Sequence, residues 1–600
     1  MPDSKPPFPK VLVANRGEIA VRVFRTLREL GVGTVAVYSE IDRGALHAAV
    51  ADEAHFIGGG PPAESYLRGA VIVETALRAG AAAIHPGYGF LAENAGFARL
   101  VEDAGLVWIG PPPAAIEAMG SKIAARERMQ AAGMPIVPGT TEPLESADEI
   151  RRVGREIGYP LAIKASAGGG GKGLKVVESE DEVERAFESA RREGEAYFAD
   201  PTVFVERYLV DPRHVEVQVI ADAHGAVVHL GERDCTIQRR HQKLVEESPS
   251  PAVDDELRRR IGAIAVEAAR AVGYRSAGTI EGLLSQEGEY FFLEMNTRIQ
   301  VEHTVTELVT GFDLVREQIL VAAGEPLSFR QDDVVLRGHA IECRINAEDV
   351  GRGFLPTPGR IAAYREPGGP GVRVDSGIRA GDEISPLYDP MIAKLIVHDV
   401  DRDRARRRML RALEEFVIDG PPTLLGFHRA LLEHPCFAAG ETCQGVAESE
   451  ALAQRAEELT ESLSHRRTTV TAGSDGHAPT RLQRAGSQVV GVEVDGRSYD
   501  VRLVVEEPPW AGLARARRGR DSGRAGGGTD TVLSPMQGTV VQVEVAEGDT
   551  VVAGQVICVV EAMKMENEIA AHRDGVVQSV AVARGQAVAA GQSICLIVDA

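Results

Sequence analysis

Two glutamates near the middle of the chain have a spacing that suits a metal site. Glu281 and Glu294 stand in TIEGLLSQEGEYFFLEMN, where two apolar runs flank a Glu-Gly turn at 287–288. A two-residue hairpin loop there would pair the glutamates and place both carboxylates on one sheet face, which Asn296 and Arg298 extend by the strand period. Buried like charges are costly unless a cation joins them, so the spacing predicts Mg²⁺ or Mn²⁺. An exposed pair on a solvated face is the alternative.

A glycine-rich run follows a predicted strand at 158–164 and reads ASAGGGGKG. Consecutive glycines let backbone N–H groups approach phosphate oxygens closely. The run is not a Walker A loop, because that loop has Ser or Thr after its lysine and Gly173 follows Lys172 here. By itself the run indicates either a mobile phosphate flap or an ordinary flexible surface loop.

Near the C-terminus, Lys564 stands between two methionines in EAMKME. The surrounding 70 residues contain a repeat with an offset of 37 residues, in which these residues of the first copy recur in the second: Gly538, Gly548, Gly554, Gln555 and Cys558. Two such alternating-strand units are predicted to pack face to face as a two-fold sandwich. The segment that joins them must turn near Lys564. Solvated turns favour Gly, Asn and Asp, so the Met-Lys-Met triplet argues against an ordinary turn lysine.

The elements that must position these residues follow from the hydrophobic pattern. From residue 11 to about 446, short β-branched runs alternate with longer amphipathic stretches, which predicts parallel α/β layers. We expect strands at 11–14, 34–38 and 107–109 and a helix over 18–30. Beyond residue 449 we expect a helix over 451–466, a short β-meander over 489–505 and a flexible, arginine-containing tether over 511–530.

Length and composition bound the function. Six hundred residues suggest roughly four structural units. The net charge of −22 makes nucleic acid and anionic membranes poor partners. Six cysteines without a C-x-x-C pair predict neither a zinc ribbon nor a disulfide framework and suit a reducing cytoplasm. Without a signal-like leader or an uncharged apolar run of about 18 residues, we expect a soluble cytoplasmic protein.

Two sets of motifs resemble known families. Ala-Met-Lys-Met at 562–565 resembles the biotin attachment site of a biotin carboxyl carrier domain; the related lipoyl domain typically has Asp-Lys-Ala at that tip, so biotin is favoured. Residues 8–450 resemble the biotin carboxylase family, an ATP-grasp fold. The matching segments are ANRGEIAVRV (14–23), HPGYGFLAEN (85–94), KASAGGGGKG (164–173), RHVEVQV (213–219), ERDCTIQRRHQKLVEE (232–247), EMNTRIQVEH (294–303) and GHAIECRINAED (338–349).

This resemblance implies five parts. A Rossmann-like α/β domain at 1–121 is followed by an ATP-grasp domain at 122–330 and a carboxylase C-terminal domain at 331–450. A connecting region at 451–530 leads to an all-β, two-fold hammerhead carrier domain at 531–600.

The resemblance also implies the site residues. The family's nucleotide contacts fall on Lys122, Lys164, Gly170, Gly171, Glu206, Arg207, Leu209, His214 and His241. Its metal ligands fall on Glu281, Glu294 and Asn296, and its bicarbonate and biotin contacts on Lys243, Arg298, Gln300, Val301, Glu302 and Arg344. Glu302 is the implied general base, Arg298 the bicarbonate fork and Arg344 the counter-ion of the biotin ureido oxygen. One departure is Gly282, where relatives often carry a bulky aromatic residue.

The implied activity is that of a ligase: bicarbonate and ATP form carboxyphosphate, which carboxylates biotin held on Lys564. We expect the α chain of an acetyl- or propionyl-type acyl-CoA carboxylase of fatty acid biosynthesis. Its expected partners are a separate carboxyltransferase β subunit, a biotin protein ligase and further copies of itself in a larger assembly. The alternatives are the corresponding subunit of a pyruvate or other non-CoA carboxylase and, less favoured, a non-catalytic biotin carrier scaffold.

Overall fold

The computed structural model divides the chain into two compact units, Met1–Thr460 and Glu461–Ala600. It describes residues 5–598 except 121, 141–142, 166–173, 199–201, 240–241, 473–484, 495–496, 507–529, 536–537, 563–564 and 590. Four of the predicted site residues, Gly170, Gly171, His241 and Lys564, lie outside the described residues.

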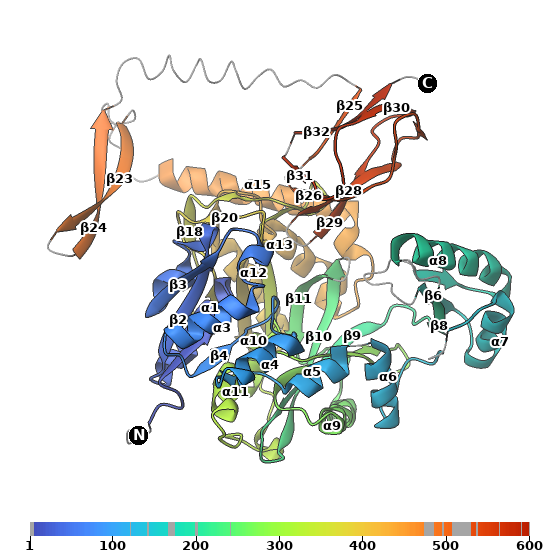
Figure 1. Cartoon of the computed structure of the whole chain (residues 1–600), viewed down its shortest axis with the longest axis horizontal. Coiled ribbons are helices and arrows are strands. Elements are labelled where there is room, and N and C mark those ends of the chain that lie inside the picture. Colours follow the sequence, from blue (N-terminus) through green and yellow to red (C-terminus); the bar gives the residue numbers. More distant parts are fainter. Residues whose placement is uncertain are drawn as a thin grey trace. The chain divides into compact units, whose positions relative to one another are not determined.

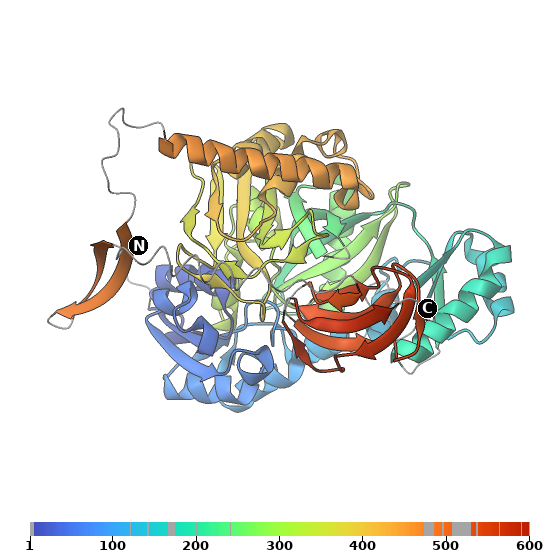
Figure 2. The ribbon, with the colours of Figure 1, turned by 90° about the horizontal axis from the view of Figure 1, so that it is seen from above.

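The first unit begins with a parallel five-stranded sheet of order β3-β2-β1-β4-β5. Its elements are β1 (Lys10–Val13), α1 (Gly17–Glu29), β2 (Gly33–Ser39), α2 (Leu46–Val50), β3 (Glu53–Gly58), α3 (Gly69–Arg78), β4 (Ala83–His85), α4 (Ala95–Asp103) and β5 (Val107–Trp108). Val11 and Val13 belong to the core that α1 covers, whereas Leu12 and Ala14 belong to the core beneath α3 and α4, so helices cover both faces (Figures 1 and 2). A strand buried on both faces needs the continuous apolar run found here. The predicted strands and helix are confirmed within one or two residues.

A small lobe with a core of its own follows. It consists of α7 (Ala147–Ile157), β6 (Leu161–Ala165), β7 (Leu174–Val177), α8 (Val183–Phe198) and β8 (Val203–Arg207), with strand order β7-β6-β8. Ile150 of α7, Ile163 of β6 and Phe187 of α8 meet in that core. Figure 1 shows α7 and α8 beside the strands of this lobe. The glycine-rich run lies in the connection between β6 and β7, outside the described residues. The lobe therefore holds the two strands from which the predicted phosphate flap extends.

The largest sheet has eight antiparallel strands in the order β13-β12-β9-β10-β11-β14-β21-β19. They are β9 (Arg213–Ala221), β10 (Val227–Arg239), β11 (Gln242–Ser248), β12 (Ser276–Leu284), β13 (Tyr290–Asn296), β14 (His339–Asn346), β19 (Val372–Ser376) and β21 (Met391–Asp399). The expected domain border at 330–331 falls between β13 and β14, so the two segments on either side share one sheet.

Helices cover the two faces of this sheet. Alternate valines of β9, Val215, Val217 and Val219, pack beneath α5 (Pro113–Gly120), α6 (Lys122–Ala131) and α9 (Asp255–Ala271). On β10, β11, β14 and β21 lies α10 (His303–Thr310), which leads to α11 (Leu314–Ala322). The even-numbered residues of β9, which include His214 and Glu216, point away from the valine face.

Short strands and three helices complete the part of the first unit between β14 and α15. The strands are β15 (Glu348–Asp349), β16 (Leu355–Pro356), β17 (Gly359–Arg360), β18 (Ala363–Arg365), β20 (Glu383–Ile384) and β22 (Val417–Asp419). The helices are α12 (Arg402–Glu415), α13 (Leu425–Glu433) and α14 (Pro435–Ala439).

The longest helix described is α15 (Glu450–Ala472), which contains the predicted helix over 451–466. Its residues Leu452, Ala456 and Leu459 are buried and follow one another at helical spacing, so its first turns pack as an amphipathic stripe. None of the helices described in this chain combines the length and the apolar character needed to cross a membrane.

The β12–β13 hairpin pairs Glu281 with Glu294, as the spacing predicts, but through a different turn. Leu284 pairs with Tyr290, which leaves a five-residue loop at 285–289 rather than a two-residue one. A β-bulge beside Glu281 then restores the predicted pairing. At Gly282 an added Cβ would overlap the Tyr290 ring, so an aromatic side chain from the neighbouring strand fills the space above this glycine.

One disulfide, Cys436–Cys443, joins α14 to the loop after it, with a Cα–Cα distance of 5.6 Å. The spacing of the cysteines did not predict this pair. Four further cysteines, Cys235, Cys343, Cys558 and Cys595, are free and buried.

The second unit contains a hairpin, β23 (Ala485–Val494) with β24 (Arg497–Glu506), at the position of the predicted meander. It also contains two four-stranded sheets, β25-β32-β30-β27 and β29-β28-β26-β31. The strands are β25 (Thr531–Leu533), β26 (Gly538–Val543), β27 (Thr550–Val551), β28 (Val556–Ala562), β29 (Met565–Ala570), β30 (Gly575–Val580), β31 (Ala587–Val588) and β32 (Ser593–Val598). β26, β27 and β28 recur as β30, β31 and β32 at the same 37-residue offset, so the predicted two-fold sandwich is confirmed.

Candidate active site

A buried guanidinium forms the floor of the candidate site. Arg233 on β10 is 0% exposed, and its donors reach five side chains on four elements. They bind Glu216 Oε1 at 2.5 Å, Gln218 Oε1 at 2.6 Å, Thr279 Oγ1 at 3.1 Å, Gln300 Oε1 at 2.6 Å and Thr306 Oγ1 at 3.0 Å. Because arginine has five donors in a rigid plane, this one side chain fixes β9, β12, the 297–302 turn and α10 relative to one another.

Lys243 is the second hub. Its Nζ lies 2.6 Å from Glu216 Oε2, 2.9 Å from Glu281 Oε1 and 2.7 Å from Glu302 Oε1. Burial alone would lower the pKa of Lys243, but the carboxylates of Glu216 and Glu302 outweigh burial and hold it well above its usual value. Lys243 is therefore a permanent cation among three carboxylates.

Glu302 connects this cluster to β14. Its Oε1 accepts from Lys243, and its Oε2 accepts from Arg344 Nη2 at 2.9 Å. Burial raises the pKa of Glu302, but Lys243 and Arg344 together hold it well below its ordinary value. Arg344 Nε in turn donates to Glu246 Oε1 at 2.5 Å. In this state Glu302 is an anion clamped by two cations.

The predicted metal pair lies on the edge of the same cluster. Glu281 Oε1 accepts from Asn296 Nδ2 at 2.7 Å and from Gln300 Nε2 at 2.6 Å, and its Oε2 lies 2.8 Å from His214 Nε2. Burial raises the pKa of Glu281, but Lys243 and His214 more than reverse this and keep it ionised.

Two carboxylates and an amide on paired strands are the hard oxygen donors that Mg²⁺ and Mn²⁺ prefer, so Glu281, Glu294 and Asn296 fit such an ion. Here Lys243 supplies positive charge beside Glu281 Oε1, and the His214 ring lies against Oε2. His214, Glu216 and Glu281 also bring one potential ligand atom each within 4.8 Å of the others.

Arg298 lies at the exposed side of the cluster. Its Nη2 donates to Asn296 Oδ1 at 2.7 Å, and its Nε donates to Glu93 Oε2 at 3.0 Å. The other oxygen of Glu93 accepts from the Thr297 backbone N–H at 2.9 Å. Glu93 belongs to the N-terminal α/β segment, so this contact joins that segment to the predicted bicarbonate arginine.

The polar groups of Val301 and Gln300 form hydrogen bonds with neighbouring strands. The Val301 carbonyl accepts from Lys394 Nζ at 2.8 Å, and Gln300 spans Arg233 and Glu281. The turn that carries both residues is therefore held from three strands, β10, β12 and β21.

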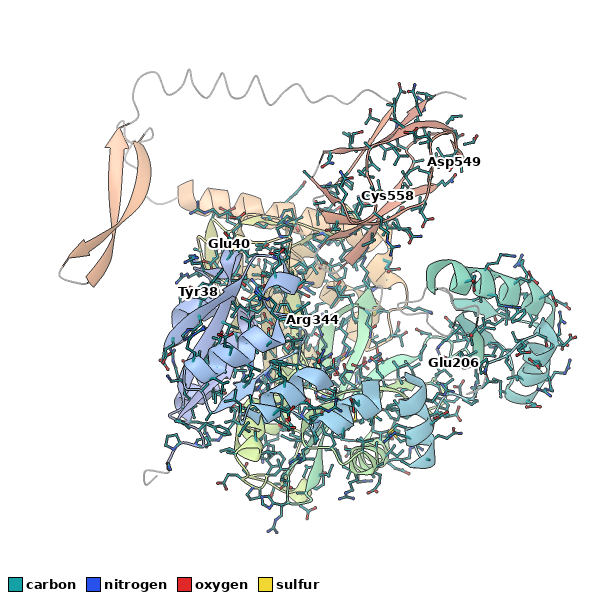
Figure 3. All side chains as sticks on the ribbon, in the orientation of Figure 1. Tyr38, Glu40, Glu206, Arg344, Asp549 and Cys558 are labelled. Carbon is teal, nitrogen blue, oxygen red and sulfur yellow. A yellow bond between two sulfur atoms is a disulfide. The ribbon has the colours of Figure 1, made fainter. Side chains whose placement is uncertain are left out.

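Three of the predicted nucleotide residues, Lys164, Glu206 and Arg207, lie on strands of the small lobe, whereas His214 lies beside Glu281. Lys164 on β6 is paired with Glu206 on β8, and Arg126 of α6 lies 3.2 Å from the same carboxylate. Arg207 lies 3.6 Å from Glu289, and Leu209 packs with Val137 and Phe291. Lys122 is the first residue of α6. Figure 3 labels Glu206 beside the lobe and Arg344 in the body of the first unit.

Sequence reasoning missed four polar residues of this site: Glu93, Glu216, Arg233 and Glu246. Each lies inside a quoted motif, but only Glu216 has a local signal, since it follows His214 at the two-residue period of a strand. The other three act through partners distant in sequence.

Family models match four segments of the chain. A model described as biotin carboxylase, N-terminal domain, matches residues 7–116, and one described as carbamoyl-phosphate synthase L chain, ATP binding domain, matches 121–330. A biotin carboxylase C-terminal domain model matches 342–448, and one described as biotin-requiring enzyme matches 530–597.

Individual relatives agree with these matches. The chain is 47% identical over 94% of its length, and 94% of the relative's, to a biotin-dependent acyl-coenzyme A carboxylase alpha3 subunit of Mycobacterium leprae. It is 56% identical to a pyruvate carboxylase subunit of Methanothermobacter thermautotrophicus, over 72% of this chain and 88% of that one. The crystal structure of the Hydrogenobacter thermophilus 2-oxoglutarate carboxylase biotin carboxylase domain dimer, with MgADP, ADP and bicarbonate, superposes with a TM-score of 0.69 at 48% identity, covering 74% and 98% of the two chains.

Proposed function

Because the chain belongs to the biotin carboxylase family and carries a biotinyl domain in the same polypeptide, we propose that it is the α subunit of an acyl-CoA carboxylase. It carboxylates its own biotinyl group with bicarbonate while ATP is cleaved to ADP and phosphate. A separate carboxyltransferase subunit then transfers the carboxyl group to acetyl-CoA or propionyl-CoA. The observation that supports the acyl-CoA assignment is the match to the mycobacterial α3 subunit over 94% of both chains, which must include much of the region after residue 450.

A second candidate is the equivalent subunit of a pyruvate-type or 2-oxoglutarate-type carboxylase. It is favoured by the 56% identity to the archaeal pyruvate carboxylase subunit, which covers 72% of this chain. Either acceptor would be bound by another polypeptide, so the carboxylase residues described above serve both candidates equally.

The first step is attack of a bicarbonate oxygen on the γ-phosphorus of ATP, which breaks the bond to ADP and gives carboxyphosphate. Lys122, Lys164 and the backbone of Gly170 and Gly171 would neutralise phosphate charge as it shifts. Mg²⁺ or Mn²⁺ held by Glu281, Glu294 and Asn296 would supply further positive charge near the phosphate groups. Glu206 holds Lys164 in place before the nucleotide binds. Arg207, Leu209, His214 and His241 are the remaining proposed nucleotide contacts.

Arg298 is the proposed anchor for bicarbonate, together with Gln300, Val301 and Lys243. Its planar fork is oriented before the substrate arrives, because Glu93 and Asn296 hold two of its nitrogens. A fork fixed in this way presents parallel N–H groups to a planar anion, which a lysine could not do.

Glu302 is the proposed proton acceptor on bicarbonate. While Lys243 and Arg344 both bind its carboxylate, its low pKa makes it a poor base. Its basicity rises when these cations turn toward substrate anions instead. The C–O bond of carboxyphosphate then breaks, and the released phosphate takes the proton of the biotinyl nitrogen. Arg344 stabilises the negative charge on the ureido oxygen while that nitrogen forms its bond to the carboxyl carbon. Base strength is thus coupled to substrate binding.

Several further assignments belong to this proposal. Lys564 carries the biotin, a biotin protein ligase attaches it, and the subunit forms oligomers within a larger complex. We place the enzyme in the cytoplasm and in fatty acid biosynthesis.

The test is to capture the native chain through its biotin and identify the subunit that accompanies it, then to assay that complex. With labelled bicarbonate and ATP, we expect fixation into acetyl-CoA or propionyl-CoA and none into pyruvate or 2-oxoglutarate. A complex made with Lys564→Arg is the matched control, since it retains the charge and lacks the attachment point. Fixation into pyruvate or 2-oxoglutarate would move the chain to the second candidate.

A further inference from the structure

Two glutamates lie directly behind Arg344, on its own strand and on the adjacent one. Glu246 on β11 and Glu342 on β14 are register partners in the eight-stranded sheet. Directly opposed residues in an antiparallel pair have Cβ atoms about 4.5–5.5 Å apart on one face. Both residues are 0% exposed. Their carboxyl groups therefore face each other in a space from which bulk water is excluded.

Each of the two carboxyl groups uses only one of its oxygens. Glu246 Oε1 accepts from Arg344 Nε at 2.5 Å, and Glu342 Oε2 accepts from the Thr304 hydroxyl on α10. Within the described part of the chain, Glu246 Oε2 and Glu342 Oε1 have no hydrogen-bond donor. Buried polar atoms are rarely left without a partner. A single proton between the two carboxyl groups would satisfy both oxygens, because a protonated carboxyl donates to an ionised one.

The charged groups that face the pair support one proton rather than none. Arg344 and Lys394 are the nearest cations, Lys243 lies beyond Glu302, and Glu302 is itself an anion. Tyr88, whose hydroxyl donates to Glu18, also faces Glu342, and burial keeps the Cys343 thiol neutral. Burial raises the pKa of Glu246 to about 8 even though Arg344 lowers it, and raises that of Glu342 to about 7 against Lys394.

We propose that Glu246 and Glu342 share one proton and act as a positioning pair for Arg344. The singly protonated pair carries one negative charge, enough to orient the guanidinium through its Nε. A fully ionised pair would add a second negative charge beside Arg344 and draw its positive charge away from the reacting oxygen. The effect of the pair on catalysis rests on the role proposed for Arg344. The shared proton itself does not depend on that role.

The shared proton is tested first in the full-length wild-type chain by infrared titration between pH 6 and pH 10. We expect a carboxylic acid C=O band at pH 7 that disappears as the pH passes about 8. Glu342→Gln should remove that band, because its amide replaces the shared proton as donor to Glu246. Glu348→Gln is the matched control: Glu348 is another buried glutamate whose pKa burial raises to about 7, but it bonds to Asn346 instead of Arg344. Absence of a pair-dependent band at pH 7 overturns the proposal.

The positioning role is tested by the pH dependence of kcat for biotin carboxylation. The protonated pair is the competent form, so wild-type kcat should fall about tenfold per pH unit above pH 8, with little change in KM for biotin. Glu342→Gln should fall less than twofold between pH 7 and pH 9, whereas Glu348→Gln should keep the wild-type profile. An unchanged alkaline fall in Glu342→Gln overturns the positioning role. If Arg344→Ala keeps its turnover while the infrared band persists, the proposed function of Arg344 has failed and the shared proton stands.

Discussion

The eight-stranded sheet and the biotinyl domain use burial in opposite ways. The sheet encloses charged side chains on several neighbouring strands, among them Glu216, Arg233, Glu246, Glu342 and Lys394, each 0% exposed. The described core of the biotinyl domain is aliphatic and thiol, with Val540, Cys558, Val577 and Cys595 at its centre. Burying charge is expensive unless every charge is paired. Burial of these charges therefore lowers the folding stability of the first region but fixes the positions of its charged side chains. In the second region the only predicted chemical function is that of one lysine, Lys564.

The sharpest way to separate the two regions is Lys564→Arg. We expect carboxylation of the acyl acceptor to fall below detection, because the biotin attachment point is gone. Free biotin should restore bicarbonate-dependent ATP cleavage, since the ATP site lies in the first unit. Failure of free biotin to rescue would mean that the carrier does more than present the cofactor.

Removal of the buried hub should show what the charged sheet costs. Arg233→Ala leaves Glu216 without the partner of its Oε1 and vacates four other acceptors. We expect a loss of about 3–5 kcal/mol in the free energy of unfolding. Chemical denaturation followed by a probe in the first unit measures it, and a loss below about 1 kcal/mol would contradict the hub assignment.

Arg344→Ala tests the chemistry of the same region. We expect kcat for biotin carboxylation to fall by about 10²–10³, the usual effect of losing one transition-state contact. Arg407→Ala on α12 is the matched control, because that arginine is 64% exposed and its ion pair is with Asp403, far from the proposed chemistry in sequence and on another element. Near-normal turnover of Arg344→Ala would remove it from the mechanism.

Acid should weaken the sheet through Glu247. Burial raises its pKa, but His339 and Arg402 lower it to about 2. A depressed folded pKa means that the stabilisation is fully present above the unfolded value of about 4.3 and is lost as the pH falls toward 2. Wild type and Glu247→Gln should therefore differ by on the order of 3 kcal/mol at pH 7, with the gap closing in acid.

The comparison variant is Glu127→Gln, an exposed glutamate on α6, for which we expect no gap at any pH. A constant gap between wild type and Glu247→Gln from pH 7 to pH 3 would mean that the effect of Glu247 is steric. Unfolding by urea across this pH range measures both variants.

The smallest effect is expected in the biotinyl core. Ile597→Val removes one methylene group from a fully buried aliphatic site. We expect a loss of about 0.5–1.5 kcal/mol, the ordinary value for this substitution. A larger loss, comparable with that of Arg233→Ala, would remove the contrast between the two regions.

Local sequence patterns predicted those features of the structure that depend on residues close together in the chain. The 37-residue offset predicted two copies of one strand unit, and β26, β27 and β28 do recur as β30, β31 and β32. The pairing of Glu281 with Glu294 was right although the predicted turn was wrong, since the bulge beside Glu281 compensates for the longer loop. The two-residue period of a strand predicts which residues share a face, but it cannot predict that a bulge will offset a longer turn.

The missed features depend on partners far apart in the chain. Glu246 and Glu342 meet only because β11 pairs with β14, and no local signal near either residue predicts that pairing. Arg233 becomes a hub only when β9, β12 and α10 surround it. The Cys436–Cys443 bridge forms across the end of α14, where cysteine spacing alone carries no motif. The roles assigned to the individual site residues remain predictions that the variants above test.

The two-fold repeat also sets the mechanics of the carrier. The repeat relates the β28–β29 hairpin, which contains the position of Lys564, to the place where β25 and β32 meet and the chain enters and leaves the domain. In Figure 1, β25 lies at one end of this domain and β29 at the other. A rotation of the domain about its β25 end would therefore displace the β28–β29 hairpin by a distance that grows with the length of the domain.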